Sequence, residues 1–559
     1  MALAAAATVI AVSGGFRTTV GGFRISMRSP LAAALGALLT GAAWFLVVRR
    51  DRAIAADLEA WWLAIERHAT RIIGVLALTS AIIASTFATR SAAGADASGY
   101  LSQAQRIAVM LPPIYFDEVG QHVPQLAAWI TTPLGWRPFE DASDTEVVGI
   151  QVPTYPPGLP LLMSVPHSIA GIEGANAIVI GSAAIAVWAT GMLAGGTAGV
   201  LAALLLAFSP VFVYQSLQPM SDVPVTAAWM VCFLLLVRGK ASWLAGVACA
   251  LAVLIRPNLA PLAIVPLLIA RQRVLFSIPV AVAGLFLALF QWSLYGSPIR
   301  SGYGSAEELF AVSNVVPNVP RYFSWLVATS PVLLLAPFGL VRLIGQRQAR
   351  GLGAFASFVV VAYLIYAVFD QWSYLRFLLP ALAVFAVFAA VALVAWIDRY
   401  PRSWRAPLLA ALLLAVAAHG LHAARSREAF RLADQLRRVE QVASFLGGRG
   451  AERPVIVSGE QSGAIRYYTA RPILRWDLAT PDALRAAVAA VERSGYSTYV
   501  ALDAWEEEPF RKKFASIPEI QIDWPPVVEA GSSHRTKLWK ISDRAKFLSG
   551  ERVATLRLP

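Results

Sequence analysis

Charged side chains are scarce in this chain of 559 residues. Asp, Glu, Lys and Arg make up only 14% of it, whereas 57% of its residues are hydrophobic. Soluble domains carry roughly 25% charged residues. Cysteine is scarcer still, because Cys232 and Cys249 are the only two and both lie in apolar runs. Neither a disulfide framework nor a thiolate zinc site is predicted. The composition excludes a disordered chain, a disulfide-rich secreted protein and an ordinary cytosolic protein.

Nucleotide- and nucleic-acid-binding patterns are also missing. No GxGxxG or GxxxxGK[ST] motif opens a turn of the polar C-terminal region, so nucleotide binding there is not predicted. The net charge of +13 is best explained by the basic residues that flank apolar runs on the cytoplasmic side of membrane proteins. Nucleic-acid binding is a weak alternative, because no basic helix interleaved with aromatic residues supports it.

Long apolar runs are the main positive feature. A transmembrane helix needs about 20 predominantly apolar residues, and several runs approach or reach that length. Spans are expected at residues 31–48, 72–88, 174–194, 196–216, 222–238, 241–255, 258–270, 274–295, 322–342, 353–369, 374–397 and 406–423. A further short run at 159–171 contains two prolines and is interpreted as a periplasmic or re-entrant helix. The sequence therefore predicts a polytopic α-helical membrane protein with about 12 spans, or 13 if 159–171 crosses.

The distribution of basic residues predicts the topology. Arginine and lysine cluster beside alternate ends of the runs, which places the loops at 89–158, 217–221, 296–320 and 370–373 outside the cytoplasm, together with everything after residue 424. Residues 1–71 are expected to hold one transmembrane helix and an interfacial helix at 51–71, with Met27 as an alternative start to Met1. The main transmembrane domain is expected at 72–423.

The C-terminal region, residues 424–559, has a different composition. It holds 17 of the 34 acidic residues and begins with a polar amphipathic pattern at 425–447. Short β-type runs follow at 454–458, 472–476 and 496–503, with a helical pattern at 481–494. Alternation of strand and helix predicts a small extracytoplasmic α/β domain with a largely parallel sheet.

Acidic residues in the membrane part stand in the expected outer loops. Asp96 follows the 72–88 span, where a carboxylate could act as a general base or position an acceptor hydroxyl. Its alternative role is a helix cap or a turn. Asp222 opens the 222–238 span on the same side, where the helix dipole also favours a carboxylate.

Aromatic and proline residues surround these acids in the sequence. Tyr100 follows Asp96, and Tyr155-Pro156-Pro157-Gly158 predicts a rigid turn at the membrane edge, with a tyrosine suited to packing against a sugar or a lipid head group. The loop Tyr295–Gly304, with Arg300 and Tyr303, suits a mobile substrate gate.

Arginines also stand on the side of the membrane that should lack them. Arg256-Pro257-Asn258 lies between two apolar runs, and Tyr374 and Arg376 open the 374–397 span. Such arginines are candidates for binding a phosphate. The alternative is an arginine that extends its head group to the membrane interface.

Together these motifs resemble the GT-C superfamily of membrane glycosyltransferases, above all the protein O-mannosyltransferase and aminoarabinose transferase branches. The resemblance covers roughly residues 72–400. It rests on Asp96, on Tyr155-Pro156-Pro157-Gly158, on Asp222 with Pro224, on Arg256-Pro257, and on the segment Tyr374 to Pro380.

The resemblance implies an inverting transfer of a sugar from a polyprenyl-phosphate carrier to an envelope glycan, lipid or protein, in the plasma (inner) membrane. Asp96 would be the base, Arg256 and Arg376 would hold the lipid phosphate, and the 159–171 helix would line the cavity. Many family members carry a second acid in the first outer loop. The candidates for it, which leave metal dependence open, are Asp117, Glu118, Asp141, Asp144 and Glu146.

Two other function classes are compatible with a membrane protein of this kind. A transporter or flippase for a lipid-linked or anionic substrate should show two similar halves or charges within its spans, and the sequence shows neither. A non-enzymatic scaffold that displays the C-terminal domain would not need the polar clusters in the outer loops.

Overall fold

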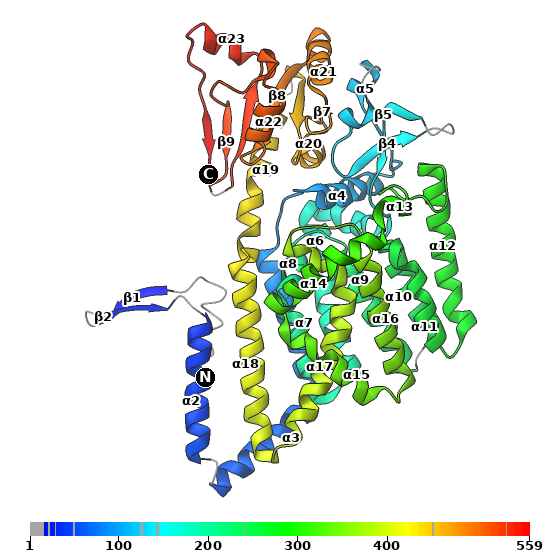
Figure 1. Ribbon diagram of the computed structural model, residues 1–559, viewed down its shortest axis with the longest axis vertical. Helices are drawn as coiled ribbons and strands as arrows, with labels where there is room; N and C mark the ends of the chain where they lie inside the picture. The colour runs from blue at the N-terminus through cyan, green and yellow to red at the C-terminus, as the bar shows by residue number, and fades with distance from the viewer. Residues whose placement is uncertain are drawn as a thin grey trace.

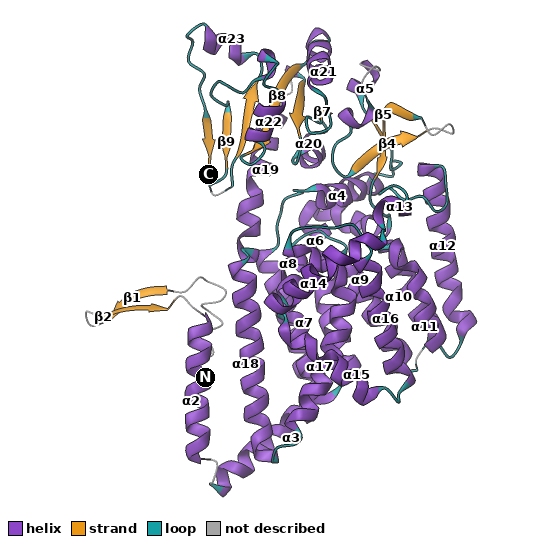
Figure 2. Ribbon diagram, in the orientation of Figure 1, coloured by secondary structure: helices purple, strands orange, loops and turns teal. Residues whose placement is uncertain are grey.

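The computed structural model describes residues 16–20, 23–27, 30–48, 51–122, 127–140, 145–239, 241–449, 452–532 and 534–559. A helical bundle forms the lower part of the molecule in Figure 1, and two sheet-containing regions lie at its upper end. Figure 2 shows the same division by secondary structure. The first outer loop and the C-terminal region thus lie at one end of the apolar bundle.

The N-terminal part begins with an antiparallel hairpin of β1 (Phe16–Val20) and β2 (Phe23–Met27), followed by α2 (Pro30–Val48). The next helix, α3 (Arg52–Phe87), is continuous over 36 residues, and Asp51 caps it by accepting hydrogen bonds from the amides of Ala53 and Ile54. The expected interfacial helix and the expected 72–88 span are therefore one helix, because no proline or glycine pair interrupts the stretch. The boundary placed at residue 71 lies within it.

The bundle contains the remaining apolar helices. They are α6 (Gly158–Ala194), α7 (Gly196–Ala207), α8 (Pro210–Ser216), α9 (Asp222–Val237), α10 (Ser242–Ile255), η2 (Pro257–Ala263), α11 (Ile264–Ile269), α12 (Arg273–Tyr295), α14 (Val315–Thr329), η4 (Pro331–Leu335), α15 (Ala336–Leu343), α16 (Arg347–Leu364), η5 (Trp372–Leu378), α17 (Leu379–Ile397) and α18 (Arg402–Ser426). Within the described residues, five helices are long and apolar enough to cross a membrane, or up to seven if each of two bent pairs is one span, and four shorter apolar helices accompany them. The chain is an integral membrane protein, and the count of 12–13 spans stays a prediction.

Prolines explain where the helices depart from the expected spans. The run at 196–216 is divided between α7 and α8 with a bend of 63°, and the run at 322–342 is divided after Ser330 with a bend of 112°. Pro210 and Pro331 stand at these breaks, where a missing N–H and a bulky ring end a helix. The 159–171 segment is helical and joins the rest of α6 across a kink at Ala170 and Gly171, where Gly171 has a φ of 56°.

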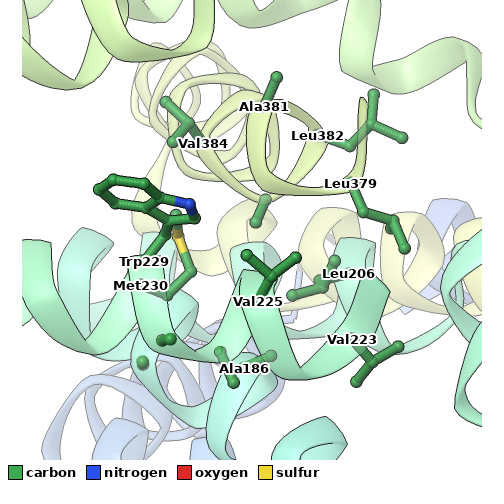
Figure 3. Packing of buried hydrophobic residues seen from close by; sticks show 14 of the residues in the cluster. Ala186, Leu206, Val223, Val225, Trp229, Met230, Leu379, Ala381, Leu382 and Val384 are labelled. Carbon is green, nitrogen blue, oxygen red and sulfur yellow. The ribbon is translucent and has the colours of Figure 1, made fainter. Parts of the chain in front are cut away.

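Closely packed side chains join the central helices. Figure 3 shows Trp229 of α9 beside Val384 of α17, with Val225 of α9 close to Leu206 of α7 and Ala186 of α6 nearby. Each of these side chains is at most 1% exposed. In a membrane such packing, rather than the hydrophobic effect, holds helices together. It fixes the positions of the helix ends that carry the polar residues.

The first outer loop folds into a small layer over the bundle. It comprises α4 (Ala95–Ala108), β3 (Tyr115–Phe116), α5 (Glu118–His122), η1 (Ala128–Thr131), β4 (Trp136–Glu140) and β5 (Glu146–Pro153). The strands form an antiparallel sheet in the order β3-β5-β4. The second outer loop contributes α13 (Ala306–Leu309) and η3 (Val312–Asn314). The loop predicted at 89–158 is thus largely ordered.

The C-terminal region forms the predicted α/β domain. Its elements are η6 (Ala429–Arg431), α19 (Leu432–Gly447), β6 (Pro454–Ser458), α20 (Ser462–Thr469), β7 (Ile473–Leu474), α21 (Pro481–Arg493), β8 (Ser497–Asp503), α22 (Glu507–Lys513), η8 (Pro518–Ile520), β9 (Val528–Ala530), β10 (Thr536–Lys540), α23 (Asp543–Leu548) and β11 (Leu556–Leu558). The sheet order is β11-β9-β10-β8-β6-β7. The predicted strands pair in parallel, but β10 pairs antiparallel with both neighbours. Because β11 pairs in parallel with β9, three of the five pairings are parallel, and the sheet is mixed with a parallel majority.

The C-terminal domain and the first outer loop share one hydrophobic core. Val119 and Ile130 of the loop are 0% and 3% exposed and pack with Trp476 and other buried residues of the domain. A buried ion pair reinforces the contact, because the Arg466 guanidinium lies 3.1 Å from the Asp117 carboxylate. The two units are therefore fixed relative to each other.

A glycine makes the closest approach between the domain and the loop. Gly463 at the start of α20 lies so near Ser98 of α4 and the Leu134 carbonyl that a Cβ atom there would overlap both. The neighbouring Ser462 hydroxyl accepts a hydrogen bond of 3.1 Å from the Leu134 amide. Any side chain larger than hydrogen would push α20 away from α4.

Replacing Gly463 by valine is therefore expected to loosen the domain from the loop. Overpacking of a tight contact costs about 1–3 kcal/mol, which should appear as a lower Tm and as faster limited proteolysis within 94–135. Gly447→Val is the matched control, because a Cβ atom at Gly447 meets nothing within 4 Å. A Gly463→Val variant as resistant to protease as the control would contradict the described contact.

Candidate functional site

A cavity of about 1020 Å³ opens between the bundle, the first outer loop and the C-terminal domain. Its wall is formed by the start of α4, the turn before α6, the connection between α8 and α9, the region around η2, the loop after α12, and η5. The charged side chains on this wall, among the described residues, are Asp96, Arg256, Arg376 and Glu460. Three of these four come from the motifs singled out in the sequence.

Asp96 lies both at the start of a helix and on the cavity wall. It lies in the first turn of α4, where the helix dipole favours a negative charge, and its side chain remains 28% exposed to the cavity. The Tyr155 hydroxyl donates a hydrogen bond of 2.6 Å to one carboxylate oxygen. Arg376 donates one of 2.6 Å to the other. The carboxylate is thereby held in one orientation at the cavity wall.

Arg376 is positioned by aromatic rings. It lies on η5, and its guanidinium carbon is 5.0 Å from the ring centre of Tyr374 and 5.3 Å from that of Phe377. Besides the ion pair with Asp96, its Nε–H is buried and has no hydrogen-bond partner among the described residues. Buried donors without partners cost free energy, so this donor has unmet hydrogen-bonding capacity.

Arg256 repeats this arrangement with a different acid. It follows the last residue of α10, and it donates a hydrogen bond of 2.5 Å to Asp222 at the start of α9. Its guanidinium lies 5.4 Å from the Phe377 ring centre, so the same ring borders both arginines. One of its terminal nitrogens, Nη1, is buried without a partner among the described residues.

Asp222 itself does not reach the cavity. Its side chain is 1% exposed, and it is absent from the cavity wall. It therefore lies behind Arg256 and neutralises it, rather than facing the cavity as Asp96 does. Its position in the first turn of α9 agrees with the stabilising role expected at the start of a helix.

Tyrosines form much of the remaining wall. Tyr100 lines the cavity and donates a hydrogen bond of 3.0 Å to Ser221, and Tyr303 lines it from the loop after α12. Tyr155 is 4% exposed and lies behind Asp96, with its ring packed between those of Tyr100 and Tyr303. The structure thus brings these three predicted residues together.

Most of the other predicted site residues also lie on the wall. Pro156, Pro157, Asn258 and Tyr374 line the cavity. Asn258 donates a hydrogen bond of 2.9 Å to the Tyr363 hydroxyl. Arg300 is not on the wall and lies 2.6 Å from Glu140 in the first outer loop. Its ion pair ties the two outer loops together.

The 159–171 helix does not line the cavity as the resemblance implied. None of its residues is on the wall. His167 instead lies 2.7 Å from the Tyr467 hydroxyl of the C-terminal domain, so this segment contributes to the contact with that domain. The kink at Gly171 directs it there.

None of the described candidates for the second acid of the first outer loop lies at the cavity either. Asp117 is buried against Arg466, Glu118 lies 4.0 Å from Arg453, and Glu146 accepts a hydrogen bond from the Trp129 indole. Asp141 and Asp144 lie outside the described residues. The second acid on the wall is Glu460, from a part of the chain that the sequence analysis had assigned to a separate domain.

A divalent metal does not fit the described part of the site. No group of three or more His, Cys, Asp or Glu residues lies together within the described ranges. Both oxygens of Asp96 already accept hydrogen bonds, from Tyr155 and Arg376. The described residues therefore give no support for a metal-dependent step.

Several wall residues escaped the sequence analysis. They are Tyr214, Gln215, Gln291, Tyr363, Tyr366 and Glu460. The tyrosines and glutamines lie at helix ends within apolar runs, where they carry no local motif. Glu460 follows a predicted strand, and the carboxyl end of a parallel strand is a general location for ligand-binding residues.

Comparison with known proteins gives a fold but no relative in sequence. No protein-family model matches the chain, and no curated protein matches it significantly. Among solved structures, the chain is similar to ArnT from Cupriavidus metallidurans bound to undecaprenyl phosphate, with a TM-score of 0.50, 12% identity, and coverage of 84% of this chain and 97% of ArnT.

Two further solved structures are similar at lower scores. The apo state of the same ArnT gives a TM-score of 0.48 at 12% identity, with the same coverage of both chains. AglB from Archaeoglobus fulgidus, in complex with an inhibitory peptide and a dolichol-phosphate, gives 0.47 at 14% identity and covers 77% of this chain and 69% of AglB. The similarity to undecaprenyl-phosphate-bound ArnT confirms the predicted fold, a GT-C-like bundle followed by a C-terminal domain.

Proposed function

We propose that this protein is an integral-membrane glycosyltransferase that moves a sugar from a polyprenyl-phosphate carrier to an acceptor outside the cytoplasm. The observation that carries the proposal is the shared cavity. It holds one oriented carboxylate, Asp96, beside two arginines, and each arginine keeps a buried N–H donor for which the described residues offer no partner. A phosphate is the ligand that such planar, unsatisfied donors bind best.

The chemistry follows from this arrangement. Asp96 takes the proton of an acceptor hydroxyl, and the resulting oxygen nucleophile forms a bond to the anomeric carbon of the donor sugar. The bond between that carbon and the phosphate oxygen breaks, and its electron pair leaves with the polyprenyl phosphate. Arg256 and Arg376 stabilise the charge that develops on this phosphate. Attack from the face opposite the leaving group inverts the anomeric centre.

The hydrogen bonds of the site support these roles. Tyr155 orients the Asp96 carboxylate, and Asp222 holds Arg256 in place within a low-polarity surrounding. Arg376 pairs with Asp96. When a phosphate binds, its charge replaces part of that pairing, so that Asp96 becomes a better proton acceptor.

The fold also supports the proposal that the cavity and the C-terminal domain lie on the same side of the membrane. Because that domain packs on the first outer loop, both lie on one side of the membrane. The positive-inside rule places this side outside the cytoplasm. A polyprenyl carrier stays in the bilayer, so its head group would enter the cavity from the membrane surface. Membrane lipids surround the bundle.

Binding of undecaprenyl phosphate tests the donor half of the proposal. The ligand should raise the Tm of the purified protein in a concentration-dependent manner. Arg376→Gln should weaken binding about ten- to hundredfold, because hydrogen bonds to charged groups contribute about 1.5–3 kcal/mol. Arg321→Gln is the control, since Arg321 pairs with the exposed Asp370 and is not on the cavity wall. Equal binding by wild type and Arg376→Gln would contradict the phosphate site.

Glycan analysis of a deletion strain tests the reaction itself. The strain should lose one sugar from an envelope glycan, lipid or protein, and the wild-type chain should restore it. This comparison also identifies the sugar and the acceptor. A deletion strain with an unchanged envelope would contradict the proposed function.

A further inference from the structure

Glu460 brings the C-terminal domain into the cavity. It stands in the short connection between β6 and α20, and its backbone amide donates a hydrogen bond of 3.0 Å to the Glu506 carboxylate. Its own side chain is exposed on the cavity wall. The contact of the following residues Ser462 and Gly463 with the first outer loop fixes this connection over the cavity.

Within the part of the chain that the structure describes, the Glu460 carboxylate has no partner of its own. The other charged residues of the wall pair with one another or with Asp222, whereas no hydrogen bond or ion pair is found for the Glu460 side chain within the described residues. Desolvation, followed by the nearby charge of Asp503, raises the pKa of its carboxyl above the ordinary value. Its unmet hydrogen-bonding capacity faces the space where a substrate would lie.

Charge decides which substrate can approach it. A phosphate of the donor would be repelled by Glu460, whereas the two arginines attract it. A cationic group would be attracted by Glu460, but the nearby Arg376 would repel it. The Glu460 carboxylate is close enough to Tyr374 to act on it electrostatically, and the Arg376 guanidinium lies over the Tyr374 ring. A neutral hydrogen-bond donor meets neither objection, and hydroxyl groups are such donors.

We propose that Glu460 binds the acceptor substrate by accepting hydrogen bonds from its hydroxyl groups, so that the C-terminal domain selects the acceptor. This inference rests on the proposed glycosyltransferase function. The donor phosphate would then lie at the arginines and the acceptor hydroxyls at Glu460, and Asp96 lines the same cavity. Glu460 is a binding residue in this scheme and takes no proton.

The test separates acceptor binding from donor binding. A detergent extract of envelopes from the deletion strain supplies both substrates. For each purified variant, the extract concentration that gives half-maximal sugar transfer is measured. Glu460→Ala should raise that concentration about ten- to hundredfold, the effect of losing a hydrogen bond to a charged group. Its affinity for undecaprenyl phosphate should stay within about twofold of wild type, because Glu460 does not touch the phosphate in this scheme.

Two variants sharpen the result. Glu460→Gln should raise the half-maximal concentration less than Glu460→Ala, because its amide oxygen still accepts a hydrogen bond from a hydroxyl. Glu492→Ala is the control, since Glu492 is an exposed acid on α21 of the same domain and lies outside the cavity. The Tm of all three should match wild type, because neither side chain has a partner to lose among the described residues.

Three outcomes would overturn the inference. A half-maximal concentration unchanged in Glu460→Ala would remove Glu460 from acceptor binding. Equal losses in the alanine and glutamine variants would indicate a cationic acceptor group instead of hydroxyls. A wild-type protein that neither transfers sugar nor binds undecaprenyl phosphate would overturn the proposed function itself. The first two outcomes, in contrast, would overturn only the role of Glu460.

Discussion

Replacing Asp96 by asparagine is expected to lower sugar transfer by about 10²- to 10⁴-fold, the range that a general base contributes. The amide has nearly the same shape, and its oxygen can still accept the hydrogen bond from Tyr155. It cannot take a proton from a hydroxyl, however, and its NH₂ group would face the donors of Arg376. The loss should therefore appear in turnover, measured with the envelope extract, while the protein still inserts into the membrane.

The matched control for this variant is Glu146→Gln. Glu146 belongs to the same outer loop, accepts a hydrogen bond from Trp129, and lies away from the cavity. It should transfer sugar at the wild-type rate. Wild-type activity in Asp96→Asn would exclude Asp96 as the base and leave it with the structural role of stabilising the start of α4.

The second large effect is expected from Asp222→Ala. Removal of one partner from a buried ion pair costs about 3–5 kcal/mol, because the other charge is left unpaired in a region of low polarity. Arg256 and Asp222 are 11% and 1% exposed, so the cost should approach the full range and appear as a marked fall in Tm. Binding of undecaprenyl phosphate should fall as well, because Arg256 loses the group that orients it.

A double variant distinguishes stability from function. Asp222→Leu combined with Arg256→Met replaces the pair by apolar groups, which is often neutral or stabilising in buried sites. Its Tm should recover while undecaprenyl phosphate binding stays lost. Asp370→Ala, which breaks an exposed pair with Arg321, should cost at most about 1 kcal/mol. Full ligand binding by the double variant would show that Arg256 does not hold the phosphate.

The sequence predicts those features that depend on local pattern. Apolar runs identify most bundle helices, and alternating strand and helix signals identify β6, β7, β8 and α21. Arg256 and Arg376 are recognised as candidates because they are expected on the side of the membrane where the positive-inside rule predicts few arginines. These features lie within short segments, so neighbouring residues suffice to recognise them.

Features that depend on contacts between distant segments are not visible in the sequence. The pairing of Asp222 with Arg256 removes Asp222 from the cavity, yet its position at the start of a span is equally compatible with a catalytic acid. The antiparallel strands β9 and β10 are short and lack a strong alternating pattern. Glu460 reaches the cavity only because the whole C-terminal domain packs on the first outer loop.

The core shared by the first outer loop and the C-terminal domain also constrains how the protein is made. Val119, Ile130 and Asp117 are translated long before Trp476 and Arg466, the residues that cover them. Until those residues are made, the loop carries apolar surface and an acid that lacks its arginine partner. A chain interrupted before residue 460 lacks both Glu460 and the contact of Gly463 with the first outer loop, so its cavity is unfinished. Synthesis of the C-terminal domain is therefore the step that assembles the site.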